Sequence, residues 1–186
     1  MQQITLTSSG GRRSLAQLDA GVPEPGPGEV RLAVQAAGVC GSDVGAWQGK
    51  NAYDFLDTPR VLGHEYVGVV DALGTNVDTV DADDRVVERP LHACGVCTAC
   101  RNGVEHVCER LAITGFHFDG AFAPYHIAPV DALHPIPAGI PDRRAAVTEP
   151  MAVAARATLD RISVRASDAV LVLGAGPMGS YSALIA

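Results

Sequence analysis

The sequence of 186 residues contains one lysine, one tryptophan and no apolar run of about 18 residues. It therefore predicts no membrane-spanning helix, and its polar first 13 residues lack the apolar core of a secretory signal. Positive charge is also in deficit, with a formal net charge of -7. Because nucleic acids and anionic membranes attract lysine- and arginine-rich surfaces, neither is expected as a partner. We expect a cytoplasmic protein.

The composition favours a folded, turn-rich chain with room for one domain and part of a second. Hydrophobic residues make up 47%, which disfavours disorder, and 20 glycines with 12 prolines favour β structure over a helical bundle. Up to residue 135, short strand-like segments alternate with turn signals, which predicts a β domain of barrel type. The expected strands are Gln3–Thr7, Ser14–Leu18, Glu29–Ala36, Tyr66–Ala72, Arg85–Glu88 and Ala121–Ile127.

The pattern changes after residue 141. An amphipathic helix is predicted over Met151–Ile162, because its apolar residues recur at helical spacing and Glu149 and Pro150 suit a helix start. The segment Asp168–Leu173 contains a continuous apolar run bounded by glycine, which is typical of a buried strand in a parallel sheet.

A glycine-rich turn follows that expected strand and precedes a second helix-like stretch. A lone GxGxxG motif is a weak signal, but this copy has the strand-and-helix context that dinucleotide binding requires. Backbone N–H groups at such a helix start bind a pyrophosphate. The acidic ribose-binding residue is expected about 20 positions further on, beyond the sequence, so NAD and NADP stay open. The predicted cofactor-binding residues are Gly174, Gly176, Pro177, Met178 and Gly179.

Four of the five cysteines fall within 15 residues. Four thiolates at this spacing can surround one tetrahedral zinc ion with no open position, so the site would hold a loop together without catalysis. Four unrelated buried thiols are the plain alternative. An iron–sulfur cluster is the other, since C-x2-C-x2-C also opens ferredoxin motifs, but a seven-residue gap before the fourth cysteine and the absence of Cys-Pro favour zinc. The four are Cys94, Cys97, Cys100 and Cys108.

A second, catalytic metal site is predicted at Cys40 and His64. Taken singly, each is more often a packing residue, but each lies beside a glycine and near a carboxylate. A cysteine, a histidine, a carboxylate and one open position together make a catalytic zinc site. The third ligand is Glu65 or Glu149. On one regular strand His64 and Glu65 would point to opposite faces, which favours Glu149 unless that residue is only an acidic helix start.

These motifs, in this order, resemble the zinc-dependent medium-chain alcohol dehydrogenases. The Cys-Gly-Ser-Asp motif and the Glu149-Pro150 pair are closer to the sorbitol and threonine dehydrogenase branch, and the resemblance covers essentially the whole chain. It implies a GroES-like β-barrel catalytic domain at residues 1–148, with a structural zinc lobe at 90–110. Residues 149–186 would then form a connecting helix and the first β-α unit of a truncated α/β Rossmann domain.

The resemblance also assigns roles. Ser42 matches the hydroxyl that takes the substrate alcohol's proton, and Asp43 matches the carboxylate that orients the histidine ligand. It implies two zinc ions per chain, NAD or NADP, a small secondary alcohol or polyol as substrate, and a homo-oligomer. The residues that match its catalytic zinc ligands and its additional carboxylates are Cys40, His64, Glu65 and Glu149.

The sequence departs from that family in two respects. Polyol and threonine dehydrogenases carry a relay histidine where this chain has Gly45; His117 or His126 could compensate, or simply pack. Trp47 and Phe55, expected on a loop after the Cys-Gly-Ser-Asp motif, could line the substrate pocket or simply pack. The missing part of the Rossmann domain predicts that this chain alone binds zinc but binds NAD poorly and turns over little. Two other classes of function stay open beside the dehydrogenase. They are an iron–sulfur electron carrier and a non-catalytic zinc-stabilised barrel module.

Overall fold

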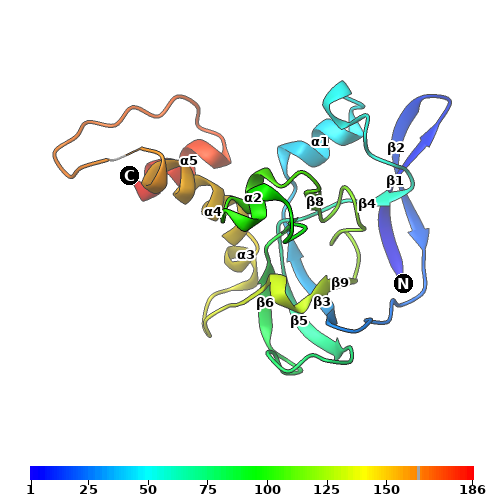
Figure 1. Ribbon diagram of the computed structural model, residues 1–186. Helices are drawn as coiled ribbons and strands as arrows, with labels where there is room; N and C mark the ends of the chain where they lie inside the picture. The colour runs from blue at the N-terminus through cyan, green and yellow to red at the C-terminus, as the bar shows by residue number, and fades with distance from the viewer. Residues whose placement is uncertain (163) are drawn as a thin grey trace.

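Figure 1 shows the protein as a computed structural model that describes residues 1–162 and 164–186. A β-rich body carries every strand of the described residues, and a C-terminal arm, coloured orange to red, extends from it. The strands are β1 (Gln2–Ser9), β2 (Arg12–Asp19), β3 (Glu29–Ala37), β4 (Arg60–Val61), β5 (Tyr66–Leu73), β6 (Arg85–Glu88), β7 (Leu91–His92), β8 (Ala112–Ile113), β9 (Tyr125–Pro129) and β10 (Leu133–Pro135).

Short helices connect these strands or form the arm. No helix in the described part of the chain combines the length and the apolarity that a membrane crossing needs. The helices are α1 (Gly41–Trp47), η1 (Asn51–Tyr53), α2 (Thr98–Arg101), η2 (Glu105–Val107), η3 (Val130–Ala132), α3 (Asp142–Ala145), α4 (Thr148–Ala155), η4 (Arg156–Asp160) and α5 (Pro177–Ile185).

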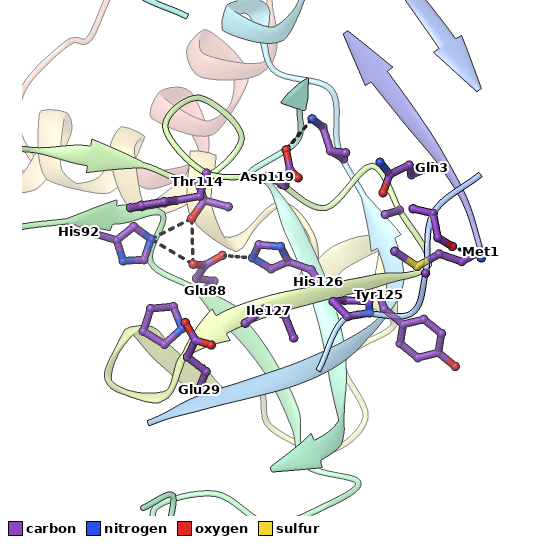
Figure 2. A pocket seen from close by; sticks show the side chains of 18 residues that line it. Met1, Gln3, Glu29, Glu88, His92, Thr114, Asp119, Tyr125, His126 and Ile127 are labelled. Atoms are coloured by element: carbon purple, nitrogen blue, oxygen red, sulfur yellow. Dashed lines mark hydrogen bonds and ion pairs between the residues drawn. The ribbon is translucent and has the colours of Figure 1, made fainter. Parts of the chain in front are cut away.

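The strands form three antiparallel sheets, in the orders β2-β1-β4, β10-β6-β5-β3-β9 and β7-β8. In the five-stranded sheet, β6 and β9 are separated by two strands, yet the Glu88 and His126 side chains they carry lie 3.2 Å apart (Figure 2). Side chains so distant in strand order can meet only if the sheet curls back on itself. The mostly β, barrel-like body predicted from the sequence is therefore confirmed.

The concave face of the curled sheet holds the main core. Val30 and Leu32 alternate along β3 as fully buried residues, and they pack with Tyr66 and Val70 of the adjacent strand β5 and with Val86 of β6 beyond it. Each such side chain contributes about 1.5–3 kcal/mol by leaving water. A second cluster brings α1 and the β4 region onto β1, and its buried members are Leu6, Ala46, Leu56, Leu62 and Phe116.

Five of the six predicted strands lie within two residues of observed ones. The sixth, Ala121–Ile127, is wrong at its start, because the observed strand begins at Tyr125. The backbone N–H groups of Ala121 and Phe122 bond to the loop carbonyls of Gly63 and Leu62 instead of a ladder partner. Pro124 then offers no N–H, so regular pairing begins only after it.

The arm differs more from the prediction. The helix begins at Thr148 rather than Met151, and it continues as the π-helical turn η4 to Asp160. The strand predicted over Asp168–Leu173 is wrong as a strand, since that stretch is extended without a ladder, and Leu171 and Leu173 are 82% and 88% exposed. A parallel strand needs a neighbour for its backbone groups, and the described residues supply none. The domain boundary at 148/149 stays a prediction.

Candidate metal centres and the glycine turn

One candidate centre gathers side chains from two distant segments. Cys40 caps the N-terminus of α1, while His64 and Glu65 lie between β4 and β5. The donor atoms of the three residues all lie within 4.8 Å of one another, and His64 and Glu65 are almost fully buried. A thiolate, an imidazole and a carboxylate at this separation form a donor set that suits zinc.

His64 is oriented from both sides of its ring. Nδ1 lies 3.7 Å from the Asp43 Oδ1, and Nε2 lies 3.4 Å from the Ser42 Oγ. Nδ1 is buried and has no hydrogen-bond partner in the described residues, and the Asp43 carboxylate is the ionisable group that approaches it at 3.7 Å. A carboxylate behind one ring nitrogen, with the other nitrogen facing the remaining donors, is the usual arrangement of a metal-binding histidine.

Asp43 is itself held firmly. Its Oδ2 accepts the Cys40 N–H at 2.9 Å, and its Oδ1 accepts the Gly63 N–H at 3.3 Å. Burial raises the pKa of Asp43, while the nearby His64 and the two backbone donors oppose that rise. The same carboxylate therefore joins the helix start to the segment that carries His64.

The sequence left open whether Glu65 or Glu149 is the third ligand of the candidate catalytic metal site. Glu65 is disfavoured only if it lies with His64 on a regular strand, but residues 64 and 65 precede β5 and do not alternate as strand residues do. That premise is therefore wrong, and Glu65 joins the 4.8 Å group while Glu149 lies outside it. Burial raises the pKa of Glu149, and the charges of His64 and Glu65 both act on it, so it lies nearby at the start of α4.

Burial also raises the pKa of the Cys40 thiol, and the Glu65 charge adds to the rise, while hydrogen bonding to Ser42 opposes it. A thiol in these surroundings is a poor nucleophile by itself, because the thiolate is the reactive form. The neighbouring donors His64 and Glu65 make Cys40 a candidate metal ligand, since a bound cation would supply the charge that stabilises its thiolate.

Aromatic rings cover this centre. Phe116, which the sequence analysis missed because it follows no motif, has its ring centroid 5.5 Å from that of His64 and 5.8 Å from that of Tyr53. Phe55 lies 6.5 Å from Phe116, and it stacks on His117. Trp47 closes α1 and is 46% exposed; the expectation of a loop there is wrong, because Ser42 to Trp47 is helical.

Neither histidine considered as a relay lies against Ser42. His117 Nδ1 accepts the Ile113 N–H at 3.1 Å, and its ring packs on Phe55. His126 is buried beside Glu88, as described above for the curled sheet. Both positions are those of packing or structural residues.

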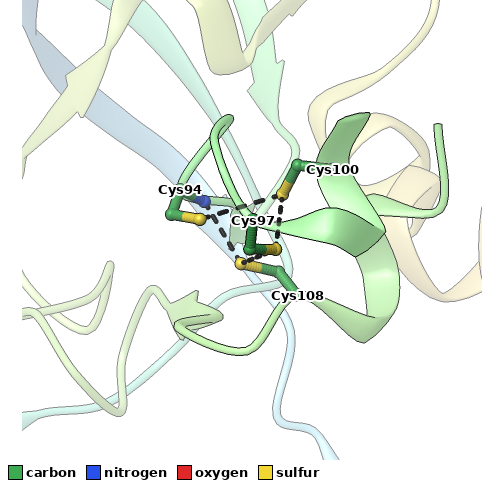
Figure 3. Close-up of side chains that lie close together, drawn as sticks. All are labelled: Cys94, Cys97, Cys100 and Cys108. Carbon is green, nitrogen blue, oxygen red and sulfur yellow. Dashed lines mark hydrogen bonds between the residues drawn. The ribbon is translucent and has the colours of Figure 1, made fainter. Parts of the chain in front are cut away.

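The four-cysteine lobe is the second candidate centre (Figure 3). Its Sγ atoms are 3.9 Å apart for Cys94 and Cys100, 3.5 Å for Cys97 and Cys100, and 3.9 Å for Cys97 and Cys108. Four sulfurs at about 2.3 Å from one tetrahedral zinc ion stand about 3.8 Å apart. The observed separations therefore fit a single ion. In an iron–sulfur cluster the four thiolates are divided among two or more iron atoms and cannot all stand this close together, so the cluster alternative is not favoured.

Backbone N–H groups point at these sulfurs. Cys108 Sγ accepts N–H bonds from Cys94 and Arg110, each at 3.3 Å. Backbone donors at Val96 and Cys97, aided by the Arg110 guanidinium, lower the pKa of Cys94 to about 6. The thiolate is therefore favoured at Cys94, whereas burial and the neighbouring sulfurs raise the pKa of Cys100 to about 12, so a bound cation would be needed to stabilise four thiolates together.

The glycine turn is a close connection that leads into α5. Gly174 has φ +111, which side chains rarely adopt, and a Cβ at Gly179 would lie within 2 Å of the Gly174 carbonyl oxygen. Gly176 caps α5 and Pro177 is its first residue, so the free N–H groups of the helix start, including that of Met178, lie at the turn. These features suit close approach of a pyrophosphate.

Comparison with known proteins identifies relatives. Residues 26–138 match the family described as the alcohol dehydrogenase GroES-like domain. The chain is 41% identical to the starvation-sensing protein RspB of Escherichia coli over 89% of its length and 48% of that protein's. It is 38% identical to an L-threonine 3-dehydrogenase of Anaeromyxobacter over 90% of its own length and 49% of the relative's. The chain thus spans about half the length of these curated relatives.

Two solved structures extend this similarity. A short chain alcohol dehydrogenase of Escherichia coli complexed with NADH matches 98% of this chain and 51% of its own, with a TM-score of 0.88 and 36% identity. A thermostable alcohol dehydrogenase from Pyrobaculum aerophilum, bound to cobalt and zinc, matches 98% of this chain and 55% of its own, with a TM-score of 0.86 and 30% identity.

Proposed function

This chain belongs to the alcohol dehydrogenase GroES-like domain family, and from that premise we propose that it is the N-terminal portion of a zinc-dependent oxidoreductase. The reaction is hydride transfer between a small secondary alcohol or polyol and NAD or NADP. The observation that carries the proposal is the convergence of Cys40, His64 and Glu65, with Asp43 behind the imidazole. Such a donor set, unlike the closed four-cysteine lobe, leaves an open metal position.

The proposed roles follow from the contacts. Cys40, His64 and Glu65 hold the catalytic zinc, with Glu149 as a second carboxylate nearby. A zinc ion bound there would lower the pKa of an alcohol oxygen, as it does for water. Ser42, whose Oγ lies at the Nε2 face of His64, carries the alcohol's proton outward.

The remaining groups support that chemistry. Asp43, which two backbone N–H groups hold in place, faces Nδ1 of His64 and would fix the tautomer and orientation of that ring. The four-cysteine lobe holds a structural zinc that takes no part in the reaction. The turn at Gly174, Gly176 and Gly179, together with Pro177 and Met178, binds the pyrophosphate of the nicotinamide cofactor, which supplies the hydride chemistry.

Cellular context is part of the proposal. Free thiolates in a metal lobe suit a reducing compartment, which favours the cytoplasm. The exposed apolar residues of the arm, among them Leu171 and Leu173, favour assembly with further polypeptide, and a homo-oligomer is the proposed state.

Metal analysis tests the proposal directly. The purified chain should hold two zinc ions, and Cys40→Ala should hold one, retained by the lobe. One zinc in both proteins would contradict the catalytic site and favour a non-catalytic zinc-stabilised barrel. Titration with NADH tests the arm separately, because an incomplete binding domain should bind it weakly. Micromolar affinity would overturn that expectation.

A further inference from the structure

A buried carboxylate lies between the two candidate centres. The Glu88 side chain, at the end of β6, is 0% exposed and accepts contacts on both oxygens (Figure 2). Oε2 accepts the Tyr66 hydroxyl at 2.8 Å and lies 3.2 Å from the His126 Nε2. Oε1 accepts the Thr114 hydroxyl at 2.9 Å and lies 3.2 Å from the His92 Nε2. Four side chains from four segments thus meet at one group.

The donor and acceptor of each hydrogen bond in this network follow from those of its neighbours. Thr114 has a single hydroxyl proton, which it donates to Glu88, so its oxygen accepts from the His92 Nε2, 2.8 Å away. The His92 proton therefore sits on Nε2, and Glu88, Thr114 and His92 form a closed ring of contacts. Burying a carboxylate without such donors would cost much free energy. The donors are therefore held in place around Glu88, and the network is rigid.

One side of the Glu88 network belongs to the four-cysteine lobe. His92 ends β7, two residues before Cys94, and Thr114 directly follows β8, six residues after Cys108. The chain entering the lobe and the chain leaving it are therefore tied to the same carboxylate. The two-residue ladder between β7 and β8 closes the base of the lobe at this point.

The other side belongs to the centre at His64. Tyr66 directly follows Glu65, and Thr114 lies two residues before Phe116, whose ring packs on His64. The Gly63 carbonyl accepts the Ala121 N–H at 2.9 Å, so the chain beyond Phe116 also bonds beside His64. Glu88 thus reaches the candidate ligands from two directions.

We propose that Glu88 is a positioning residue that couples the two metal centres: metal in the four-cysteine lobe fixes His92 and Thr114, and through Glu88 it improves metal binding at Cys40, His64 and Glu65. The inference rests on the proposed metal sites. Glu88 makes no hydrogen bond to Cys40, His64 or Glu65, nor to the four cysteines, in the described residues. It therefore acts only through its hydrogen-bonded partners.

A double-mutant cycle in the full chain tests the coupling, with Co²⁺ as the probe of the Cys40 site. Cys97→Ala opens the lobe, and the d–d absorption of Co²⁺ reports affinity and ligand geometry at the other centre. In the otherwise unchanged chain, opening the lobe should weaken Co²⁺ binding at the Cys40 site by about five-fold or more, the usual lower bound of energetic coupling. In a Thr114→Val background it should weaken binding by less than about two-fold.

Thr114→Val removes one hydroxyl and nearly preserves volume. Thr5→Val is the matched control, because Thr5 is also buried and its hydroxyl has no partner in the described residues. In the Thr5→Val control, opening the lobe with Cys97→Ala should weaken Co²⁺ binding at the Cys40 site as much as it does in the unchanged chain. Tyr66→Phe, which removes only the phenol contact to Glu88, should reduce the dependence as Thr114→Val does and should shift the d–d band.

The outcomes separate the two hypotheses. If Co²⁺ fails to bind at the Cys40 site in the unchanged chain, the proposed catalytic centre is wrong. If Co²⁺ binds but opening the lobe has equal effects in the unchanged, Thr114→Val and Tyr66→Phe chains, the coupling through Glu88 is wrong. Should Thr114→Val fail to fold, Tyr66→Phe decides, because it interrupts the other branch of the same network.

Discussion

The two candidate metal centres are built in opposite ways. All four donors of the lobe come from 15 successive residues, with backbone N–H groups pointing at the sulfurs. The donors at Cys40, His64 and Glu65 come from segments more than 20 residues apart, which the pairing of β3 with β5 and the two backbone bonds of Asp43 bring together. A local site depends on spacing, whereas a dispersed site depends on the fold. Substitutions at the two centres should therefore have different effects on the protein.

The largest expected difference is in stability. Cys97→Ala should lower the thermal midpoint of the zinc-loaded chain by roughly 10 °C or more, because structural zinc contributes directly to folding. Cys40→Ala should remove the other zinc with a much smaller shift. Differential scanning calorimetry with metal analysis of both variants measures this. Equal shifts would mean that the two centres do not differ in structural role.

The next effect concerns Glu88, which is joined to the lobe through His92. Burial by itself would raise the pKa of Glu88, but hydrogen bonds from His126, His92 and Tyr66 outweigh it and lower the pKa from 4.5 to about 2. A lowered folded-state pKa stabilises the protein above pH 4.5, and that contribution is lost as the pH falls from 4.5 towards 2.

The shift corresponds to about 3 kcal/mol at neutral pH. Urea unfolding of the original chain and Glu88→Gln should therefore differ by about that amount at pH 7 and converge near pH 2. A difference independent of pH would show that the charge of Glu88 is not what stabilises the fold.

A smaller effect should follow at the dispersed centre. Asp43→Ala should weaken Co²⁺ binding there by about 10–100-fold, because the imidazole of His64 loses the carboxylate that orients it. Ser42→Ala, on the same helix, should leave Co²⁺ affinity within about two-fold. Competition with a chelator measures both, and equal losses would contradict the separate roles of the two residues.

The smallest effect is expected in the C-terminal arm. The arm supplies none of the residues Cys40, His64 and Glu65 and none of the four cysteines of the lobe. Leu171→Ser should change the free energy of unfolding of this chain by less than about 0.5 kcal/mol, since the side chain is 82% exposed. It should reduce self-association measured by analytical ultracentrifugation. A large loss of stability would mean that the apolar run is buried in solution.

The sequence predicted most of the strands because alternation and turn residues are local signals. It singled out Cys40 and His64 as candidate ligands by their glycine and carboxylate neighbours, yet it left both Glu65 and Glu149 open as the third ligand. That choice depends on whether residues 64 and 65 belong to a regular strand, and the chain leaves strand geometry there.

Other features carried no local signal at all. Glu88, His92 and Thr114 form a network only because the five-stranded sheet curls and brings β6 against β9. Phe116 covers His64 from a loop that follows the lobe. The apolar run ending at Leu173 has the pattern of a buried strand, but pattern alone cannot supply the neighbour that a ladder requires.

The compact origin of the lobe has a consequence for biosynthesis. Its four sulfurs and the short ladder at its base, Leu91–His92 with Ala112–Ile113, are complete once residue 113 has left the ribosome. An ion captured at that moment would be bound before β9 or the arm has emerged to pack against the lobe. The nascent lobe would then serve as a preformed anchor onto which the later strands assemble.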